Sequence, residues 1–249
     1  MGAIDGKHIL MQKPHNAGSD YHNYKGTESI VLMAVCDSEY KFTVCDIGQP
    51  GRQSDGGIWE DSTFGRALQH GGINLPEDRN LPGGSDPMPF VFVGDEAFPL
   101  KPYLMRPWPG RMLTDETRKI YNYRLSRARR VIENTFGILS ARWRLLHTKM
   151  IADNEKAVSL VRAMCVLHNF LRTTVDLSYA PPGYCDTLQA DGNVQEGFWR
   201  GSQIATLGMD GHASRSSTAK AAEIRNAFTN YFSSERGSVP WQLNHVRAI

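Results

Sequence analysis

RKIYNYRLSRARRVIENTFGILSARWR, residues 118–144, is the segment around which the rest of this chain is organised. Its apolar residues recur at near-helical spacing and predict one long amphipathic helix, with a stripe formed by Leu125, Ala128, Ile132 and Leu139. Basic residues crowd the rest of the segment, and Glu133 is its only acidic residue. Helical geometry puts Glu133 about 100° from Ile132, at the edge of the apolar stripe.

Glu133 has two interpretations. In the first, it forms a helical ion pair with Arg129 or Arg130, one turn earlier, which contributes only a few tenths of a kcal/mol. In the second, it is a carboxylate ligand at the rim of a basic surface that receives phosphate. The helix taken alone favours the first interpretation.

Composition and charge favour a folded protein with an uneven charge distribution. The 249 residues are 41% hydrophobic and 10% aromatic, which argues against global disorder. The net charge of +2 hides an asymmetry: residues 1–100 carry 7 basic and 14 acidic groups, 101–150 carry 12 and 3, and 151–249 carry 9 and 9. An acidic part followed by a basic block suits a metal site that faces a polyanion, although solvated helix faces produce similar numbers.

Cysteine spacing and hydropathy indicate an intracellular protein. The four cysteines are dispersed, without a CxxC pair, which predicts reduced thiols in a cytosolic or nuclear protein. No apolar run approaches the ~18 to 20 residues of a membrane span, and the first 20 residues lack the apolar core of a secretory signal. We therefore expect a soluble protein without a membrane partner.

Four segments predict strands of one sheet. Residues 2–9, 29–35 and 41–47 are rich in β-branched and apolar residues and suggest an antiparallel meander. Residues 90–95 form a short apolar run that ends in Asp95, which is typical of a buried strand that delivers its last residue to a site. Because the chain begins in the middle of a strand pattern, we expect upstream sequence to be missing.

The remaining segments predict loops and helices. Residues 48–57 form a loop by composition, after which Asp61 or Ser62 caps a helix that runs to about Leu68. Thr114 or Asp115 caps the long helix. A second, more buried helix covers 154–171, and the apolar residues around its His168 and Asn169 favour a structural hydrogen-bonding role for the histidine over a catalytic one.

Three carboxylates on different elements are candidates for a metal site: Asp5 on the first strand, Asp95 and Glu133. Carboxylate oxygens are hard ligands suited to Mg²⁺ or Mn²⁺. Two such ions about 4 Å apart would activate a water or a 3′-hydroxyl for in-line displacement at a phosphodiester. Composition alone does not establish this site, because 26 acidic residues offer many accidental triples.

Several motifs together resemble a known family. GAIDGKHI, VCDIGQPGRQSDGGIWEDS, VFVGDEAFPLKPYL, RRVIENTFGILSARWRLL and CVLHNFL, in this order, are similar to the DDE-type endonuclease domain of PIF/Harbinger transposases and of Harbinger transposase-derived nucleases. The C-terminal IRNAFTNYFSSERGSVPWQ also resembles the end of those proteins. The resemblance spans nearly the whole chain and is weakest from about 175 to 215.

This resemblance implies an α/β, RNase H-like fold: a central mixed sheet with the antiparallel meander, flanked by helices, and the catalytic glutamate on the long helix. It implies catalytic and metal-ligating roles for Asp5, Asp95 and Glu133, with Mg²⁺ or Mn²⁺ as cofactor. Asp55, in the loop QPGRQSDGG, is a candidate auxiliary ligand or an organiser of its loop. The structural role is favoured, because aspartate is a natural turn residue.

Basic residues near these acids are candidates for DNA contacts, since Lys and Arg neutralise the phosphate backbone without reading sequence. We name Lys101, Arg129, Arg130, Arg142 and Arg144. Each taken separately is also explained as a solvated charge. Trp143, between two arginines, either stacks on a base or belongs to the core, and the core is favoured.

The domain organisation follows from the resemblance and from composition. We expect a nuclease domain over 1–172 and a linker or mobile segment over 173–217, which is rich in Gly, Ser and Thr. Residues 218–249 are expected to form a C-terminal helix and tail that pack on the nuclease domain. Family members usually carry a helix-turn-helix region before the nuclease domain, whereas this chain begins at the first catalytic strand.

Two functions are compatible with the sequence. The first is a divalent-metal-dependent DNA endonuclease or transposase-derived nuclease. The second is a catalytically inactive, domesticated relative that serves in the nucleus as a DNA- or protein-interaction module. The resemblance implies DNA and a separate Myb-like DNA-binding protein as partners, and a location in the nucleus with the cytoplasm as the other candidate. The oligomeric state is left open.

Overall fold

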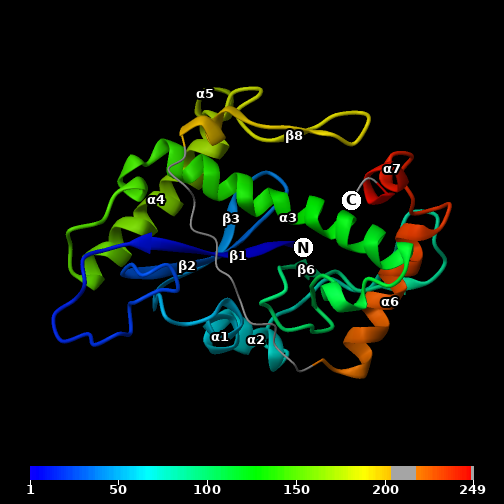
Figure 1. Cartoon of the computed structure of the whole chain (residues 1–249), viewed down its shortest axis with the longest axis horizontal. Helices are drawn as coiled ribbons and strands as arrows, with labels where there is room; N and C mark the ends of the chain where they lie inside the picture. Colours follow the sequence, from blue (N-terminus) through cyan, green and yellow to red (C-terminus); the bar gives the residue numbers. More distant parts are fainter. Residues whose placement is uncertain (203–216, 248–249) are drawn as a thin grey trace.

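A five-stranded mixed sheet forms the centre of the computed structural model, which describes residues 1–202 and 217–247 (Figure 1). Its strand order is β3-β2-β1-β6-β7. The first three strands are antiparallel, while β6 and β7 run parallel to β1. Their bounds are β1 Gly2–Leu10, β2 Ser29–Cys36, β3 Phe42–Pro50, β6 Phe92–Val93 and β7 Leu104–Met105. The predicted meander is confirmed, and the predicted strand at 90–95 is only two residues long.

Seven α-helices in the described part of the chain surround this sheet. They are α1 Asp55–Asp61, α2 Thr63–Gln69, α3 Glu116–Arg142, α4 Asn154–Thr174, α5 Asp176–Tyr179, α6 Ala219–Ser233 and α7 Gln242–Arg247. Two small hairpins pair β4 Arg79–Asn80 with β5 Pro87–Met88, and β8 Thr187–Leu188 with β9 Val194–Gln195. Short 3₁₀ helices are η1 Gly110–Met112, η2 Arg144–His147 and η3 Phe198–Ser202. None of the helices that the structure describes is both long and apolar enough to cross a membrane.

Helices α3 and α4 cover one face of the sheet. Every residue of β2 is buried, because this central strand is covered on both faces. Leu32, Ala34 and Cys36 point from it toward α3 and α4, and pack with Ile132 and Phe136 of α3. Burial of apolar surface at about 25 cal/mol per Å² makes this layer the main source of cohesion between the long helix and the sheet.

Helices α1 and α2 cover the opposite face. Val31, Met33 and Val35 point to this side and pack with Ile58 and Trp59 of α1. The prediction that 48–57 is entirely loop is therefore wrong at its end: α1 begins at Asp55, with Ser54 as its N-cap. Tertiary burial of the helix outweighs the poor helix propensity of its two glycines. The helix predicted after Ser62 is confirmed as α2, whose N-cap is Ser62.

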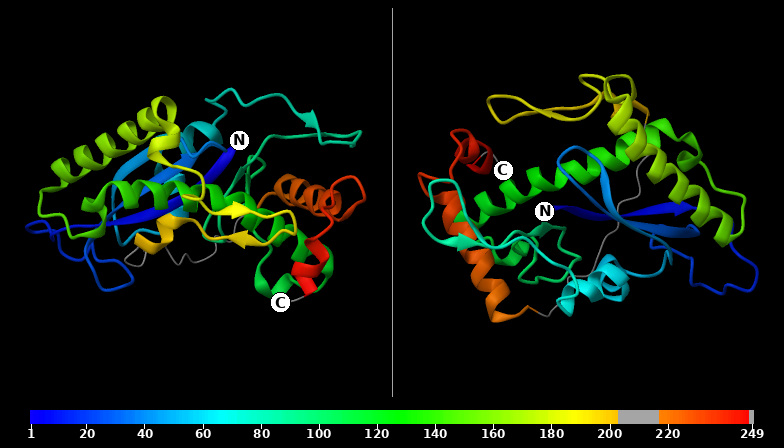
Figure 2. Two further views of the ribbon diagram at one scale, coloured as in Figure 1. Left: turned by 90° about the horizontal axis from the view of Figure 1, so that it is seen from above. Right: turned by 180° about the vertical axis from the view of Figure 1, so that it is seen from behind.

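Helix α3 is long because its two halves pack on different partners. Its N-cap is Asp115, whose side chain accepts a hydrogen bond from the Arg118 N–H at 2.9 Å. The second half packs on the sheet, whereas Tyr121 and Leu125 in the first half pack with α6. Figure 2 shows the β8–β9 hairpin crossing over α3 in the left view and standing away from this helix in the right view. The linker predicted over 173–217 contains α5, β8, β9 and η3 in the part up to residue 202. Residues 203–216 of this predicted linker lie outside the described residues.

The end of α4 is attached to the start of β3 by polar side chains. Asn169 accepts from the Phe42 N–H at 2.8 Å and donates to the Phe42 carbonyl at 2.7 Å. His168 is fully buried, and its ring nitrogens contact the Tyr179 hydroxyl at 2.9 Å and the Tyr40 carbonyl at 2.7 Å. The predicted structural role of His168 is confirmed.

Candidate metal centre

Strand register brings Asp5 and Asp95 together. β1 and β6 are neighbouring parallel strands in which Ala3 pairs with Val93, so that Asp5 and Asp95 each lie two residues further along. Neighbouring strands are about 4.8 Å apart, which places the two carboxylates side by side. Asp5 lies on the face of β1 that also carries Ala3, and this face is covered by α3.

Asp55 joins them from the first turn of α1. The adjacent Gly56 lies so close to the turn after Asp95 that a Cβ at this glycine would be 2.6 Å from the Ala97 carbonyl oxygen. Carboxylate oxygens of Asp5, Asp55 and Asp95 all lie within 4.8 Å of one another. The structure therefore brings together two of the three predicted ligands and the auxiliary candidate, and a tertiary contact rather than a loop turn determines where Asp55 lies.

Burial and mutual repulsion keep protons on this cluster. Burial raises the pKa of Asp5 to about 7 and that of Asp55 to about 8, and the charge of Asp95 adds to both shifts. The pKa of Asp95 is also raised by burial. The guanidinium of Arg129 on α3 acts in the opposite direction on all three pKa values. A bound cation would favour the ionised form of these carboxyls and lower their pKa values, so the raised pKa values indicate a cation site.

The unpaired oxygens of the cluster fit a divalent cation. Asp5 and Asp95 each accept a backbone hydrogen bond at 2.9 Å with one oxygen, from Gly6 and Ala97 respectively. Both carboxylate oxygens of Asp55 are buried without a hydrogen-bond partner among residues 1–202 and 217–247. A buried carboxylate without a partner is costly, and a hard cation with oxygen ligands would compensate that cost.

Glu133 approaches the cluster but is not in the group of three. It is half-buried on α3, and its charge raises the pKa of Asp5, so it acts on the cluster from the helix side. Arg129 lies one turn before it, and the Nε of Arg129 is buried without a hydrogen-bond partner in the described part of the chain. Glu133 and Arg129 thus both act on Asp5 from α3, where Glu133 raises its pKa and Arg129 lowers it.

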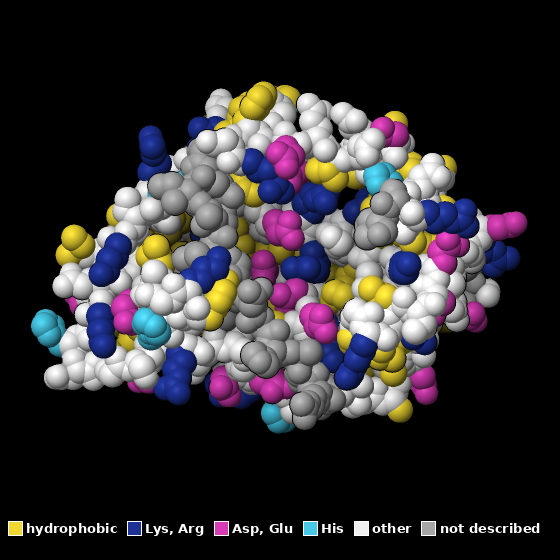
Figure 3. Space-filling view, in the orientation of Figure 1, with side chains coloured by type: hydrophobic (Ala, Val, Ile, Leu, Met, Phe, Trp, Pro, Cys, Tyr) yellow, Lys and Arg dark blue, Asp and Glu magenta, His cyan; other side chains and the backbone are white. Residues whose placement is uncertain are grey.

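The predicted DNA-contacting residues have different surroundings. Figure 3 shows Lys and Arg side chains gathered around acidic ones at the centre of one face. Lys101 is 3.7 Å from Glu60, and Arg144 is exposed. Arg142 donates to the carbonyls of Tyr179 and Ser178, which gives it a structural role. Burial works to raise the pKa of Asp186, but the hydrogen bond from Arg200 lowers it, and the charge of Arg130 contributes to the lowering.

Trp143 packs against the core between the sheet, α3 and α4, so the interpretation as a core residue is confirmed.

The sequence analysis did not identify Lys7, Asp186 and Arg200. Lys7 lies two residues after Asp5, and strand periodicity alone predicts that both point to the same face. Burial lowers the pKa of Lys7 to about 8, and its ammonium lies 6.0 Å from the Phe136 ring of α3. Asp186 and Arg200 are in a segment without periodicity, where no signal marks them.

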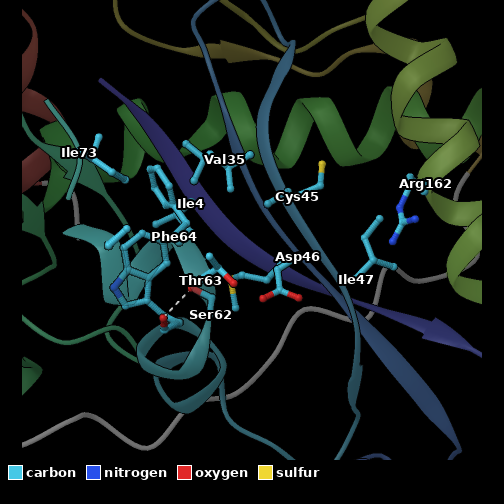
Figure 4. A pocket seen from close by; sticks show the side chains of 15 residues that line it. Ile4, Val35, Cys45, Asp46, Ile47, Ser62, Thr63, Phe64, Ile73 and Arg162 are labelled. Carbon is cyan, nitrogen blue, oxygen red and sulfur yellow. Dashed lines mark hydrogen bonds between the residues drawn. The ribbon is translucent and has the colours of Figure 1, made fainter. Parts of the chain in front are cut away.

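A separate cavity of about 450 Å³ lies on the other face of the sheet (Figure 4). It is lined by Ile4 and Asp46 from the strands and by Ser62 and Phe64 at the start of α2. Asp46 is in the middle of β3, and its neighbour across the sheet, Met33, packs toward α1. This cavity therefore does not contain the three clustered aspartates.

Comparisons with known proteins agree with the geometry. The chain is 29% identical over 173 residues to "Protein ALP1-like" from Arabidopsis thaliana, covering 68% of this chain and 42% of that protein. It is also 29% identical over 174 residues to "Putative nuclease HARBI1" from Homo sapiens, covering 68% of this chain and 45% of that protein. The chain spans less than half the length of these curated relatives. No solved structure matches it.

The family comparison covers the region that holds the site. A model described as "DDE superfamily endonuclease" matches residues 4–169, which include the central sheet except the first two residues of β1, as well as α1 and α3, and therefore Asp5, Asp55, Asp95 and Glu133. DDE superfamily endonucleases use divalent metals, and the cluster of three aspartates lies inside the matched region. The resemblance to Harbinger-derived nucleases is confirmed, and the chain belongs to the DDE superfamily endonucleases.

Proposed function

We propose that the chain is a divalent-metal-dependent DNA endonuclease that cleaves phosphodiester bonds, with Asp5, Asp95 and Glu133 as catalytic residues. One observation carries the proposal: three aspartates converge in a site where both oxygens of Asp55 are buried without a partner among the described residues. Asp55 is therefore a further ligand in this proposal. The turn-organising role favoured for it by composition does not explain why its oxygens face the other two acids.

The sheet topology supports an RNase H-like fold. Three antiparallel strands are followed in the sheet by two strands parallel to the first, in the order β3-β2-β1-β6-β7. One acid lies on the central strand β1, the second follows its parallel neighbour β6, and the third is on a helix packed across them. This distribution is the one that the family resemblance implies.

The residues around the cluster would have different roles in phosphodiester cleavage. Bound Mg²⁺ or Mn²⁺ would activate a water or a 3′-hydroxyl and stabilise the leaving oxygen. Asp5, Asp55 and Asp95 would hold the cation, and the sheet and the α1 contact keep their oxygens in place before substrate arrives. Glu133 completes the ligand set from α3. Arg129 compensates the negative charge of the carboxylates from the same helix.

DNA is the substrate that these residues would recognise. Lys101, Arg129, Arg130 and Arg144 are proposed contacts to the phosphate backbone, and Arg142 is proposed to add one beside its structural role. A separate Myb-like protein is a proposed partner, and the nucleus is the proposed location. The chain matches less than half of each of these two relatives, so this proposal does not extend to the activity of those whole proteins.

Nicking of supercoiled plasmid DNA tests the function. The purified protein is expected to nick the plasmid with Mg²⁺ or Mn²⁺ and not with EDTA. Asp95→Asn and Glu133→Gln are expected to abolish nicking while the Tm stays within a few degrees of the parent. Asp46→Asn is the matched control, because it neutralises an acid in the same sheet but outside the cluster.

Each outcome of this experiment has a clear meaning. Variants that nick as well as the parent show that the site is wrongly assigned. If no form nicks, yet the parent binds DNA with a strong dependence on salt, the chain is instead the catalytically inactive interaction module that the sequence also allows.

A further inference from the structure

The segment from Cys185 to Ser202 is attached to α3 next to Glu133. Asn134, the residue after Glu133, accepts hydrogen bonds from the Asp186 N–H at 3.2 Å and the Trp199 ring N–H at 2.9 Å. The Asn134 amide also donates to the Asp186 carbonyl at 3.3 Å. The Trp199 ring lies directly on Gly137, where a Cβ would be 2.3 Å from a ring carbon, so only glycine allows this contact.

The same segment holds a rigid arginine. The side chain of Asp186 is 0% exposed and accepts from Nε and Nη2 of Arg200, the first at 2.9 Å. Asp186 also accepts from the Gly197 N–H at 2.9 Å, which fixes the carboxylate independently of the arginine. The Arg200 guanidinium lies 4.6 Å from the Trp199 ring centroid. Two planar contacts therefore determine the orientation of the guanidinium.

We propose that Arg200 binds a phosphate of the DNA strand beside the active site. The proposal rests on the proposed endonuclease function. The carboxylate fork uses Nε and Nη2, and Nη1 takes no part in it. The Arg200 side chain remains 35% exposed, although its partner is completely buried. Guanidinium groups match phosphate geometry, and an arginine already held in place loses little conformational entropy when it binds one.

The location of Arg200 suits this role. Asn134 ties the segment to the helical turn that carries Glu133. The pKa of Arg200 is raised chiefly by its hydrogen bond to Asp186, and the charge of Glu133 adds a smaller contribution. Burial works to raise the pKa of Asp186, but the hydrogen bond from Arg200 lowers it, and the charge of Arg130 contributes in the same direction. Arg130 and Arg200 are thus two cations from different parts of the chain on the Glu133 side of the cluster. A strand positioned at Glu133 would pass them.

Arg200 could instead serve only to neutralise the buried Asp186, and DNA binding separates the two roles. The double variant Asp186→Asn/Arg200→Gln removes both charges together, so that no buried charge is left unpaired and the net charge is unchanged. The control Glu116→Gln/Arg247→Gln also removes an ion pair, one that joins the start of α3 to α7. Glu116 is about 25 Å along the helix from Glu133, at 1.5 Å per residue.

Affinity for a duplex oligonucleotide is measured by fluorescence anisotropy over a series of KCl concentrations. All proteins carry Asp95→Asn, so that no strand is cut at constant Mg²⁺. The double variant is expected to lower the slope of log Kd against log salt by about 0.9, the value for one phosphate contact on B-DNA. The control is expected to keep the slope of the parent. Asp186→Asn alone should keep the slope, because Arg200 retains its charge.

A double variant that folds and keeps the parent slope overturns the inference and leaves the endonuclease proposal intact. A Tm within a few degrees of the parent establishes folding. If the Asp95→Asn parent binds no DNA at any salt concentration, the proposed function fails, and the role of Arg200 fails with it. A control that lowers the slope as much as the double variant also overturns the inference, because the effect would then not be local to Glu133.

Discussion

Gly56 lies against the carbonyl oxygen of Ala97, at a distance that leaves no space for a side chain: a Cβ on Gly56 would be 2.6 Å from that oxygen. This contact joins the first turn of α1 to the turn that follows β6. Asp55 precedes Gly56, and the Ala97 N–H donates to Asp95 at 2.9 Å. The absence of a side chain at Gly56 therefore allows Asp55 and Asp95, two proposed ligands from different elements, to lie close together.

Gly56→Ala is expected to weaken metal binding by about 10- to 100-fold, a typical cost of disturbing the support of a metal ligand. The Ala97 oxygen is backbone and cannot rotate away, so that α1 or the turn must shift and Asp55 moves from Asp95. Calorimetric titration with Mn²⁺ measures the change. Gly57→Ala is the matched control, since its Cβ would meet only the Ser54 hydroxyl, at 3.3 Å. Equal affinities of the two variants would contradict the prediction.

The metal-free protein is expected to lose stability as the pH rises from about 4 to 8. The unfolded Asp55 carboxyl ionises near pH 4, whereas the folded one, with a pKa of about 8, retains its proton. The contribution of the Asp55 carboxyl to the free energy of unfolding is therefore complete below about pH 4 and is lost as the pH rises through about 8. Asp55→Asn should raise the Tm in EDTA at pH 8 by roughly 4 to 8 °C, for about 2 kcal/mol.

Thermal melts in EDTA at several pH values test this dependence. Asp46→Asn, outside the cluster, should leave the Tm profile of the parent unchanged. Mg²⁺ should reverse the order of the parent and Asp55→Asn at pH 8, because only the parent retains the full ligand set. A parent whose Tm is constant from pH 5 to 8 in EDTA would show that the cluster is not protonated as described.

Arg129→Gln is expected to destabilise the metal-free protein more at pH 9 than at pH 5, by roughly 1 to 2 kcal/mol. At pH 9 Asp5 and Asp55, whose pKa values are about 7 and about 8, are ionised and lose the cation that lowers those pKa values. At pH 5 these two carboxyls are protonated, and the arginine has less negative charge to compensate. Urea unfolding in EDTA at both pH values measures the difference.

Arg127→Gln is the control for this experiment, because Arg127 lies on the same helix but over the rings of Tyr123 and Trp241. Its cost should not depend on pH in this range. If Arg129→Gln shows the same loss at both pH values, its charge does not act on the aspartates.

His168→Leu is expected to reduce the free energy of unfolding by about 2 to 3 kcal/mol without changing metal affinity. The substitution leaves the buried Tyr179 hydroxyl and Tyr40 carbonyl without their partner. Leu167→Ala, at an exposed position one residue earlier, should cost less than about 0.5 kcal/mol. A loss of metal affinity in His168→Leu with normal stability would contradict the structural role.

Local patterns predicted most of the scaffold. Alternating and continuous apolar runs identified the meander, and the 3.6-residue period identified α3 and α4, because these periods reflect which faces are buried. The run ending in Asp95 was informative for the same reason, although only Phe92 and Val93 pair as a strand. The motif order identified the family, which the match to residues 4–169 confirms.

Other features had no local signal. Gly56 and Gly57 predicted a loop, yet α1 begins at Asp55, because Ile58 and Trp59 are buried against the sheet. The domain boundaries at 172 and 217 stay predictions. The segment after 172 contains α5, the β8–β9 hairpin and η3, which composition alone did not indicate.

Short-range periodicity and ordered motifs are sufficient to predict the family, the strands that carry Asp5 and lead to Asp95, and the helix that carries Glu133. The folded chain was needed to find that Asp55 joins the aspartates and that Asp186 holds Arg200 beside α3. Both depend on contacts between residues far apart in the chain, Gly56 with Ala97 and Asn134 with Asp186. Such contacts depend on how whole helices and strands pack against one another, and local sequence patterns do not predict this packing.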